Sequence, residues 1–274
     1  MEQEISHPSL GSFLNPAPSC KFIPQGSPSG HYWIQHTGTG YANLEYCDMT
    51  RRCCNSTGGW MRVAHLDMTD PNQRCPSGFR PITSPKRTCG TPGRRCVSTT
   101  FPLNGVKYTR VCGRVIGYQY YSVDGFSPYY GNRSLTIDDL YLDGVSLTHG
   151  QRPRKHIWTF AAAIGETISN RNTCPCTNTD TTYTGVVPPF IGQDYFCDTG
   201  NRYSSVRAQL YHADPLWDGS GCGSTSSCCE FNNPPWFCKQ LPRPTTDDIE
   251  LRACVNEGTS NEYFSLEHVD IYVQ

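Results

Sequence analysis

The chain has 274 residues, 16 cysteines, 17% charged residues and a formal net charge of -1. This length can bury a hydrophobic core, and a near-zero charge without a basic stripe argues against nucleic acid as a partner. No apolar run approaches the length of a membrane-spanning helix, so we expect no membrane insertion.

The N-terminal region, residues 1–19, is predicted to be a flexible tail because it is rich in Pro, Ser and Gly. It has no basic segment followed by an apolar run, so no signal peptide is recognisable. Residues 20–274 are predicted to form one disulfide-rich globular domain, because no internal repeat or low-complexity linker divides them.

Short β-branched and aromatic runs separated by Gly, Pro, Asn and Asp predict a β-rich fold with little helix. The candidate strands are residues 31–35, 43–49, 60–68, 106–121, 141–149, 156–165, 248–255 and 268–274. Residues 157–168 are the best candidate for a helix and fit a buried strand equally well. We therefore expect a β-rich α+β class and a single disulfide-stapled globular domain.

The third candidate strand, residues 60–68, shows an imperfect alternation that predicts cover on both faces. Its two predicted faces are Trp60, Arg62, Ala64, Leu66 and Met68 on one side, and Met61, Val63, His65 and Asp67 on the other.

The stretch CDMTRRCCNSTGGW, residues 47–60, contains three cysteines and raises three alternatives: a metal site, a redox site or a disulfide-stapled turn. Zinc sites usually contain paired Cys-x-x-Cys or Cys/His knuckles, and the chain has no Cys-x-x-Cys. A large and even number of cysteines is typical of an oxidised extracellular protein. We therefore predict an extracellular, secreted protein with disulfides at Cys20, Cys47, Cys53, Cys54, Cys75, Cys89, Cys96, Cys112, Cys174, Cys176, Cys197, Cys222, Cys228, Cys229, Cys238 and Cys254.

Adjacent cysteines occur at 53–54 and 228–229, and a Cys-Pro-Cys at 174–176. Neighbouring residues rarely reach disulfide geometry without strain. Each neighbour is therefore predicted to bond to a different distant partner, and the full pairing stays open. Two glycosylation sequons, at Asn55 and Asn132, agree with a secreted glycoprotein.

The segment 29–70 resembles the start of fibrinogen-like domains, including the intelectin branch of lectins. Their Gly-x-Tyr-x-Ile, Tyr-Cys-Asp-Met and Gly-Gly-Trp motifs match Gly30, Tyr32, Ile34, Tyr46, Cys47, Asp48, Met49, Gly58, Gly59 and Trp60, and the intelectin-like continuation is GGWMRVAHLDMTD. The resemblance implies a fibrinogen-like N-terminal subdomain over residues 20–70, and a disulfide at Cys47 with Cys20 as the expected partner.

The divergent body, residues 71–274, lacks the family's Trp-x-x-Tyr-x-x-Gly-Phe-Gly segment and its Asp-x-Asp calcium loop. No ligand residue is therefore carried over from the family. This body resembles uncharacterised secreted proteins of marine invertebrates, a likeness that names no activity.

Nucleophilic catalysis would need a serine beside a histidine and a carboxylate, and DGVSLTHG offers Asp143, Ser146 and His149. On a strand, residues three apart point to opposite faces, and no Gly-x-Ser-x-Gly elbow is present. We therefore predict no catalytic residue and keep a hydrolase only as a third alternative.

Calcium prefers six to eight oxygen ligands, and Asp138, Asp139 and Asp143 in TIDDLYLDG are the candidate metal ligands. A further acidic group lies at Asp214 and Asp218. Neither group has EF-hand spacing, and aspartates that cap turns and face water are the alternative interpretation.

Tyr, Phe and Trp residues often stand beside Asn, Asp or Gly, a combination that suits both sugar rings and protein interfaces. Trp217, Asp218 and Trp236 are the candidate ligand-binding residues, although most aromatic rings of a β-rich domain pack in its core.

Two functions remain open from the sequence. The first is a non-enzymatic, lectin-like glycan-binding protein, with possible calcium assistance. The second is a structural protein that self-assembles into an oligomer, filament, extracellular matrix or mineral scaffold, which a near-zero net charge favours. The expected partners are glycans or extracellular matrix proteins.

Overall fold

The structure is a computed structural model that describes residues 8–36, 40–83, 87–91, 95–120, 143–151, 154–162, 236–255 and 263–274. These residues form antiparallel strands and one short 3-10 turn, η1 (Cys20–Phe22), and they contain no α-helix. The chain is thus β-rich, as predicted, and the helical part of the expected α+β class is not seen in the described ranges. Among these ranges no helix has the length and apolar character needed to cross a bilayer.

The larger sheet runs in the order β1, β2, β5, β14, β9 and β12, with β7 and β6 attached beside the N-terminal half of β14. Its members are β1 (Gly30–Gln35), β2 (Ala42–Asp48), β5 (Trp60–Asp67), β6 (Arg80–Ile82), β7 (Thr88–Gly90), β9 (Tyr108–Tyr120), β12 (Phe237–Thr245) and β14 (Tyr263–Val273). The smaller sheet has the order β11 (Lys155–Ala162), β10 (Asp143–His149), β13 (Ile249–Val255) and β8 (Arg95–Phe101). A separate hairpin joins β3 (Arg52–Cys53) to β4 (Ser56–Thr57).

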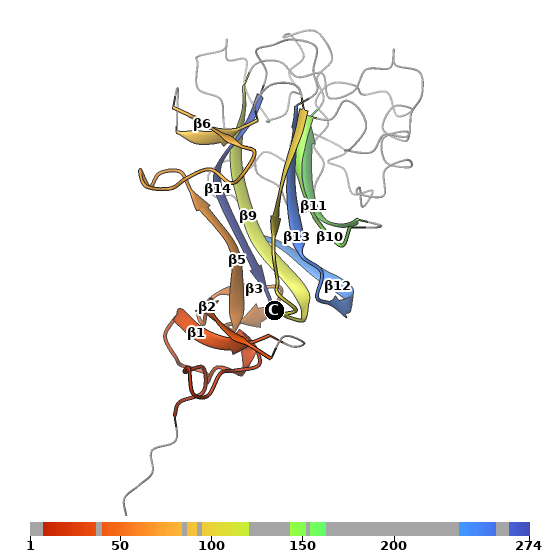
Figure 1. The fold of residues 1–274 in the computed structure, drawn as a ribbon. Helices are drawn as coiled ribbons and strands as arrows, with labels where there is room; N and C mark the ends of the chain where they lie inside the picture. Colours follow the sequence, from red (N-terminus) through yellow and green to blue (C-terminus); the bar gives the residue numbers. More distant parts are fainter. Residues whose placement is uncertain are drawn as a thin grey trace, which may run out of the picture.

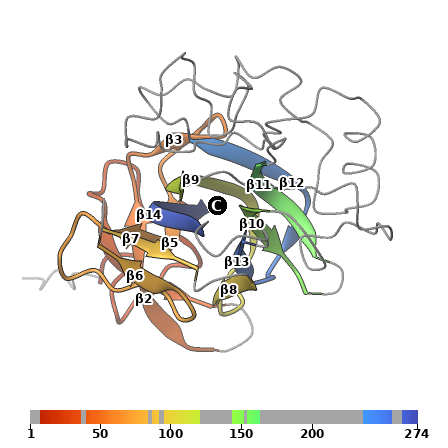
Figure 2. The same cartoon turned by 90° about the horizontal axis from the view of Figure 1, so that it is seen from above.

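The two sheets lie face to face, with one hydrophobic core between them (Figures 1 and 2). Trp158 of β11 stacks on Phe237 of β12 with their ring centres 5.7 Å apart, and this contact joins the two sheets at one edge. Side chains from both sheets fill the core, including Val97, Val111, Val115, Val145, Leu147, Ile249, Leu251, Leu266, Val269, Ile271 and Val273. The sequence of residues 157–168 fitted a helix or a strand equally well. Its described part, residues 157–162, lies in β11 and pairs with β10.

β14 shows why the C-terminal sequence HVDIYV forms a central strand. Val269, Ile271 and Val273 alternate with His268, Asp270 and Tyr272, so one face of the strand is apolar and the other is polar. The apolar face enters the core, and β5 and β9 pair with the two edges of the strand.

β5 departs from the two faces that were predicted for residues 60–68. Its register with β14 passes from Ala64 opposite Ile271 to Arg62 opposite Tyr272, so Val63 is an extra residue in a β-bulge. A bulge exchanges the faces of the residues that precede it. Ala64 therefore faces the core, whereas Trp60 packs in a second cluster beside Cys112 and Tyr272. The predicted common face for Trp60 and Ala64 is wrong for this reason.

The region predicted as a flexible tail, residues 1–19, includes residues 8–19, which the structure places against β1. Ala17 is fully buried, its N–H donates to the Trp33 carbonyl, and the Gln35 N–H donates to the Ala17 carbonyl. Residues 1–7 lie outside the described ranges.

In the part of the chain that the structure describes, four disulfides link Cys20 to Cys47, Cys53 to Cys112, Cys54 to Cys238 and Cys75 to Cys89. The Cys20–Cys47 bond is the one that the resemblance implied, and the adjacent cysteines 53 and 54 do bond to different distant partners. Of the other predicted cysteines, Cys96 and Cys254 lie on described strands, and Cys174, Cys176, Cys197, Cys222, Cys228 and Cys229 lie outside the described ranges.

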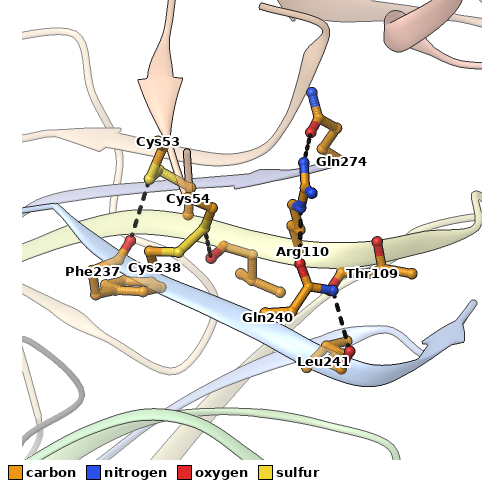
Figure 3. Close-up of a disulfide and its surroundings, with 11 residues drawn as sticks. Cys53, Cys54, Thr109, Arg110, Phe237, Cys238, Gln240, Leu241 and Gln274 are labelled. Atoms are coloured by element: carbon orange, nitrogen blue, oxygen red, sulfur yellow. Dashed lines mark hydrogen bonds between the residues drawn. A yellow bond between two sulfur atoms is a disulfide. The ribbon is translucent and has the colours of Figure 1, made fainter. Parts of the chain in front are cut away.

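Two disulfides, Cys53–Cys112 and Cys54–Cys238, decide between the three alternatives for residues 47–60, and we call them the double staple. Figure 3 shows the Cys54–Cys238 bond, with Cys53 beside it. Cys112 of β9 and Cys238 of β12 are direct partners in the strand register, so both bonds reach the large sheet at one point. Cys54 and Asn55 have φ of 51° and 56°, the left-handed conformation that a two-residue hairpin turn requires. The three-cysteine stretch is therefore a disulfide-stapled hairpin.

The Gly-Gly pair that follows the hairpin is required by close backbone approaches. A Cβ on Gly59, which has φ of +68°, would lie 2.7 Å from the Cα of Lys21. A Cβ on Gly58 would lie 2.5 Å from the Met49 carbonyl oxygen. Any larger residue at either position would displace the backbone of η1 or that of Met49, directly after β2.

Candidate functional site

A polar pocket of about 260 Å³ opens at one end of the small sheet, where β8 and β10 finish and β13 begins. We call it the sheet-end pocket. Its lining residues are Thr100, Gly150, Gln151, Thr246, Asp247, Asp248 and Glu250. Six of these seven residues carry a hydroxyl, amide or carboxylate group, so the pocket offers hydrogen bonds rather than an apolar surface.

The β12–β13 turn forms one wall of this pocket, and its sequence PRPTTDD explains its shape. Pro242 and Pro244 have no N–H to donate, and the β9–β12 register is irregular between Gln240 and Thr245. The Asp247 N–H then donates to the Thr245 hydroxyl at 3.1 Å, a short-range bond that turns the chain into β13. On the opposite wall Gly150, with φ of +73°, ends β10.

Asp247 is held by groups from three different strands or turns. His149 Nδ1 lies 2.9 Å from Asp247 Oδ2, and Lys155 Nζ lies 3.8 Å from the same oxygen. The Tyr108 hydroxyl donates to the Asp247 carbonyl at 2.9 Å. Partial burial alone would raise the pKa of the Asp247 carboxyl, but hydrogen bonds from His149 and Thr245 and the Lys155 charge outweigh it and lower that pKa. Asp247 is therefore a fixed carboxylate at neutral pH.

His149 is buried, and its protonation follows from that burial. Desolvation lowers the pKa of His149 and outweighs the opposing effect of its bond to Asp247. At neutral pH the ring is therefore uncharged, and Nδ1 carries the hydrogen donated to Asp247. One acid–base group of the pocket wall is thus neutral while its partner is charged.

Glu250 and Asp248 also accept hydrogen bonds from protein groups. Arg154 Nε donates to Glu250 Oε2 at 2.8 Å, and Arg252 Nη2 donates to Glu250 Oε1 at 3.0 Å. Asp248 Oδ1 accepts the Leu103 N–H at 2.8 Å. All three pocket carboxylates therefore have donors supplied by the protein.

Charge is balanced around the pocket. Three carboxylates, at Asp247, Asp248 and Glu250, stand against three cations, at Arg154, Lys155 and Arg252, which lie on β13, on β11 or just before it. No group of three or more His, Cys, Asp or Glu side chains in the described ranges is placed to hold a metal ion. The arrangement suits a neutral ligand with several hydroxyl groups better than an ion.

The predicted ligand-binding residues are placed as follows. Trp217 and Asp218 lie outside the described ranges, and Trp236 lies directly before β12. The Arg51 guanidinium lies between two rings, 3.9 Å from the centre of Trp236 and 4.0 Å from that of Tyr272. Trp236 thus makes intramolecular cation–π contacts beside the double staple, and its glycan contact stays a prediction.

The predicted metal and glycosylation residues are only partly described. Asp138 and Asp139 lie outside the described ranges, and so do Asn132 and the acidic pair Asp214 and Asp218. Asp143 begins β10, opposite Ala162, and His149 ends the same strand beside the pocket. At about 3.3 Å per residue, Asp143 is roughly 20 Å from the pocket end. Asn55 is exposed at the tip of the stapled hairpin.

The structure does not bring Ser146 and His149 together. The β10–β13 register is continuous from Gly144 to His149, so the two side chains point to opposite faces, as alternation predicts. Both are buried, and His149 bonds to Asp247 rather than to a hydroxyl.

A second polar cluster on the large sheet also escaped the sequence analysis. Asp270 Oδ1 accepts from His65 Nδ1 at 2.7 Å, and Asp270 Oδ2 accepts from His268 Nε2 at 2.6 Å. Burial opposes ionisation of Asp270, but the two histidines outweigh it and lower its pKa. This cluster lies on strand faces and lines no pocket found in the described ranges, so we regard it as a structural network.

The pocket residues were missed because they are far apart in the sequence. Residues 248–255 were predicted only as a strand, and the basic run RPRKH at 152–156 reads as a solvated loop. The available signal was TTDD after two prolines, where a turn carries two acids before a strand. Arg154 and Lys155 instead pair with the carboxylates of the pocket.

Comparison of the chain with protein-family models, with curated proteins and with solved structures found no match. The assignment of a function therefore depends on the chemistry of the site.

Proposed function

We propose that this is a secreted, non-enzymatic recognition protein that binds a neutral, hydroxyl-rich glycan in the sheet-end pocket. The observation that carries the proposal is a polar pocket whose charges are already balanced by protein groups. A charged ligand would meet both signs of charge there, whereas sugar hydroxyls can donate to carboxylates and accept from hydroxyl and amide groups.

The pocket is suited to sugar binding because its acceptors are held in place before a ligand arrives. Asp247 is fixed by His149 and Thr245, and Glu250 by Arg154 and Arg252. Fixed groups lose little conformational freedom on binding. Thr100, Gln151 and Thr246 are exposed and add hydroxyl and amide groups at the rim.

Two further features support an extracellular location. The described residues contain four disulfides, which a reducing cytosol would not maintain. The Asn55 sequon is exposed on the stapled hairpin, where a glycosylating enzyme could reach it. The fibrinogen-like resemblance of residues 29–70 agrees with a lectin but supplies no ligand residue. Calcium at Asp138, Asp139 and Asp143 is a separate prediction that the pocket does not need.

The test is an array of neutral and acidic glycans, followed by calorimetry on the best neutral ligand. We expect retention on neutral glycans, and a Thr246→Trp variant that fills the pocket should lose at least about tenfold in affinity. Gln151→Ala should weaken binding by roughly two- to tenfold, the effect of one hydrogen bond. Gln35→Ala, an exposed glutamine on β1, is the matched control and should bind as the wild type does.

Either of two results would overturn the proposal. The folded wild-type protein could bind no neutral glycan across a broad array. Alternatively, Thr246→Trp could bind with unchanged affinity while circular dichroism shows the native fold, which would place the glycan elsewhere.

Self-association is a second candidate function, and one observation favours it. The large apolar side chains that are exposed in the described ranges all lie between residues 13 and 44: Phe13, Leu14, Phe22, Tyr41 and Leu44. Phe13 packs edge-on against Trp33, whose partner across the β1–β2 hairpin is Leu44. An exposed apolar patch is typical of an interface, here with a second copy of the chain.

Sedimentation at increasing concentration tests this candidate. We expect association that Leu14→Ser with Leu44→Ser abolishes, with glycan binding unaffected. A wild type that stays monomeric at high concentration contradicts it.

A further inference from the structure

We infer that Cys96 and Cys254 form a disulfide across β8 and β13, on the sheet that carries the pocket. The two cysteines are direct partners in the antiparallel register of these strands. Residues opposite each other in an antiparallel pair have Cα atoms about 4.5 or 5.5 Å apart, and a disulfide usually spans about 4.4–6.8 Å. Either kind of register position therefore brings the two backbones to bonding distance.

The cysteine count agrees with this bond. Sixteen cysteines are present, and eight of them form the four described bridges. Joining Cys96 to Cys254 leaves an even number of cysteines, so all the remaining ones can also pair. Those remaining are Cys174, Cys176, Cys197, Cys222, Cys228 and Cys229.

The double staple supplies the competing arrangement. Cys112 and Cys238 are also direct partners on neighbouring strands, yet each bonds to a cysteine of the β3–β4 hairpin. By analogy, Cys96 and Cys254 would each form a disulfide with one of the adjacent cysteines 228 and 229. The direct bond needs only the described pairing of β8 with β13, whereas the competing arrangement needs two further cysteines at the same point, and the peptide map described below distinguishes the two.

The bond forms by thiol–disulfide exchange with an oxidised dithiol carrier. A sulfur–sulfur bond forms between the two cysteines while the disulfide of the carrier breaks. The two electrons and the two thiol protons pass to the carrier, which leaves as a dithiol.

The bond would clamp the two strands that hold the pocket. Thr100 and Glu250 are direct partners four residues further along β8 and β13, on the same face of the sheet as the cysteines. At about 3.3 Å per residue, the bond is roughly 13 Å from them. It would therefore resist separation of β8 from β13 without occupying the pocket. This inference does not depend on the proposed function.

Peptide mapping without reduction tests the inference directly. The protein is alkylated at acidic pH, which suppresses exchange, and digested with trypsin. Cleavage yields peptides 96–107 and 253–274, each with a single cysteine, and we expect them as one linked species. Peptides 75–86 and 88–94, which contain Cys75 and Cys89, are the internal control and should also appear linked.

A Cys96→Ser variant provides the second measurement. It should acquire one new alkylated thiol, in peptide 253–274, and its Tm should fall by roughly 5 to 15 °C. A link from peptide 96–107 or 253–274 to any peptide containing Cys174–Cys229, or free thiols at both positions in the wild type, would overturn the inference. Should the variant fail to fold, the wild-type map alone decides. Neither readout involves glycan binding, so a failed glycan array does not affect this result.

Discussion

The stapled hairpin and the sheet-end pocket are both polar, solvent-facing parts of the fold, but they are held by different forces. At the hairpin, two disulfides join very short strands to β9 and β12, and Arg51 stacks between Trp236 and Tyr272. At the pocket, hydrogen bonds and ion pairs position Asp247 and Glu250. The two-residue strands β3 and β4 bury too little apolar surface to stay docked on the large sheet, so disulfides hold them there. A binding surface needs its polar groups, so charge partners fix them and leave them available.

The largest loss of stability is expected when a disulfide of the stapled hairpin is removed. Replacing Cys54 and Cys238 by alanine should lower the free energy of unfolding by roughly 3–5 kcal/mol, because the bond closes a long loop in the unfolded chain. Urea unfolding followed by circular dichroism measures it. Cys75→Ala with Cys89→Ala is the control, since its cysteines are only 14 residues apart, and it should lose about 3 kcal/mol or less. A larger loss in the control would contradict the loop argument.

Among the residues of the sheet-end pocket, Glu250 is expected to contribute most to stability. Glu250→Gln should lower the free energy of unfolding by about 2–4 kcal/mol, because it removes the carboxylate between Arg154 and the buried Arg252. Lys155→Met is the control, because Lys155 is more than half exposed and 3.8 Å from Asp247, and it should lose less than about 1 kcal/mol. Equal losses in the two variants would show that burial does not separate these ion pairs.

A smaller loss of stability is expected at Arg51, next to the stapled hairpin. Arg51→Lys should destabilise the protein by about 1–2 kcal/mol, because lysine cannot present a planar group to two rings and pair with Asp48 as well. The neighbouring Arg52→Lys is the matched control, since Arg52 is exposed, and it should be close to neutral. Unfolding midpoints of the two variants that agree within error would remove the stacking argument.

The smallest expected effect concerns pH at the pocket. Burial lowers the pKa of His149 below its ordinary 6.5, so the unfolded chain binds more protons as pH falls through 6.5. Stability should therefore decrease as pH falls from about 7 toward the folded-state pKa, with a slope of at most about 1.4 kcal/mol per pH unit from this group.

His149→Gln should remove that part of the slope, measured by urea midpoints between pH 7.5 and pH 5. His31→Gln, at an exposed position on β1, should retain the wild-type slope. An unchanged slope in His149→Gln would mean that other groups control the acid response.

Local patterns in the sequence predicted much of the fold. Residues 268–274 were predicted as a strand, and residues 268–273 lie in β14. The adjacent cysteines 53 and 54 were predicted to bond to separate partners, and they do. The bulge at Val63 was not predictable, because an inserted residue looks like ordinary alternation until the strand is paired. Likewise, HIWTF fits a helix or a strand until Trp158 pairs with Leu147.

The pocket was beyond prediction for a related reason. Its walls come from the ends of β8 and β10 and from the turn before β13, and only the strand pairing brings these segments together. No spacing within one segment marks such a site. The sequence does contain the turn-forming TTDD, but nothing in it shows that His149 and Lys155 are the partners of Asp247 in that turn.

The adjacency of Cys53 and Cys54 has a consequence for biosynthesis. Because a ribosome delivers the chain from its N-terminus, Cys112 is available long before Cys238 emerges, and the native bond of Cys54 cannot form until most of the protein has been made. During that interval the Cys54 thiol lies next to Cys53, whose partner Cys112 is already present. A bond between Cys54 and Cys112 is the expected mispairing. An isomerase that exchanges disulfides would correct such a mispairing.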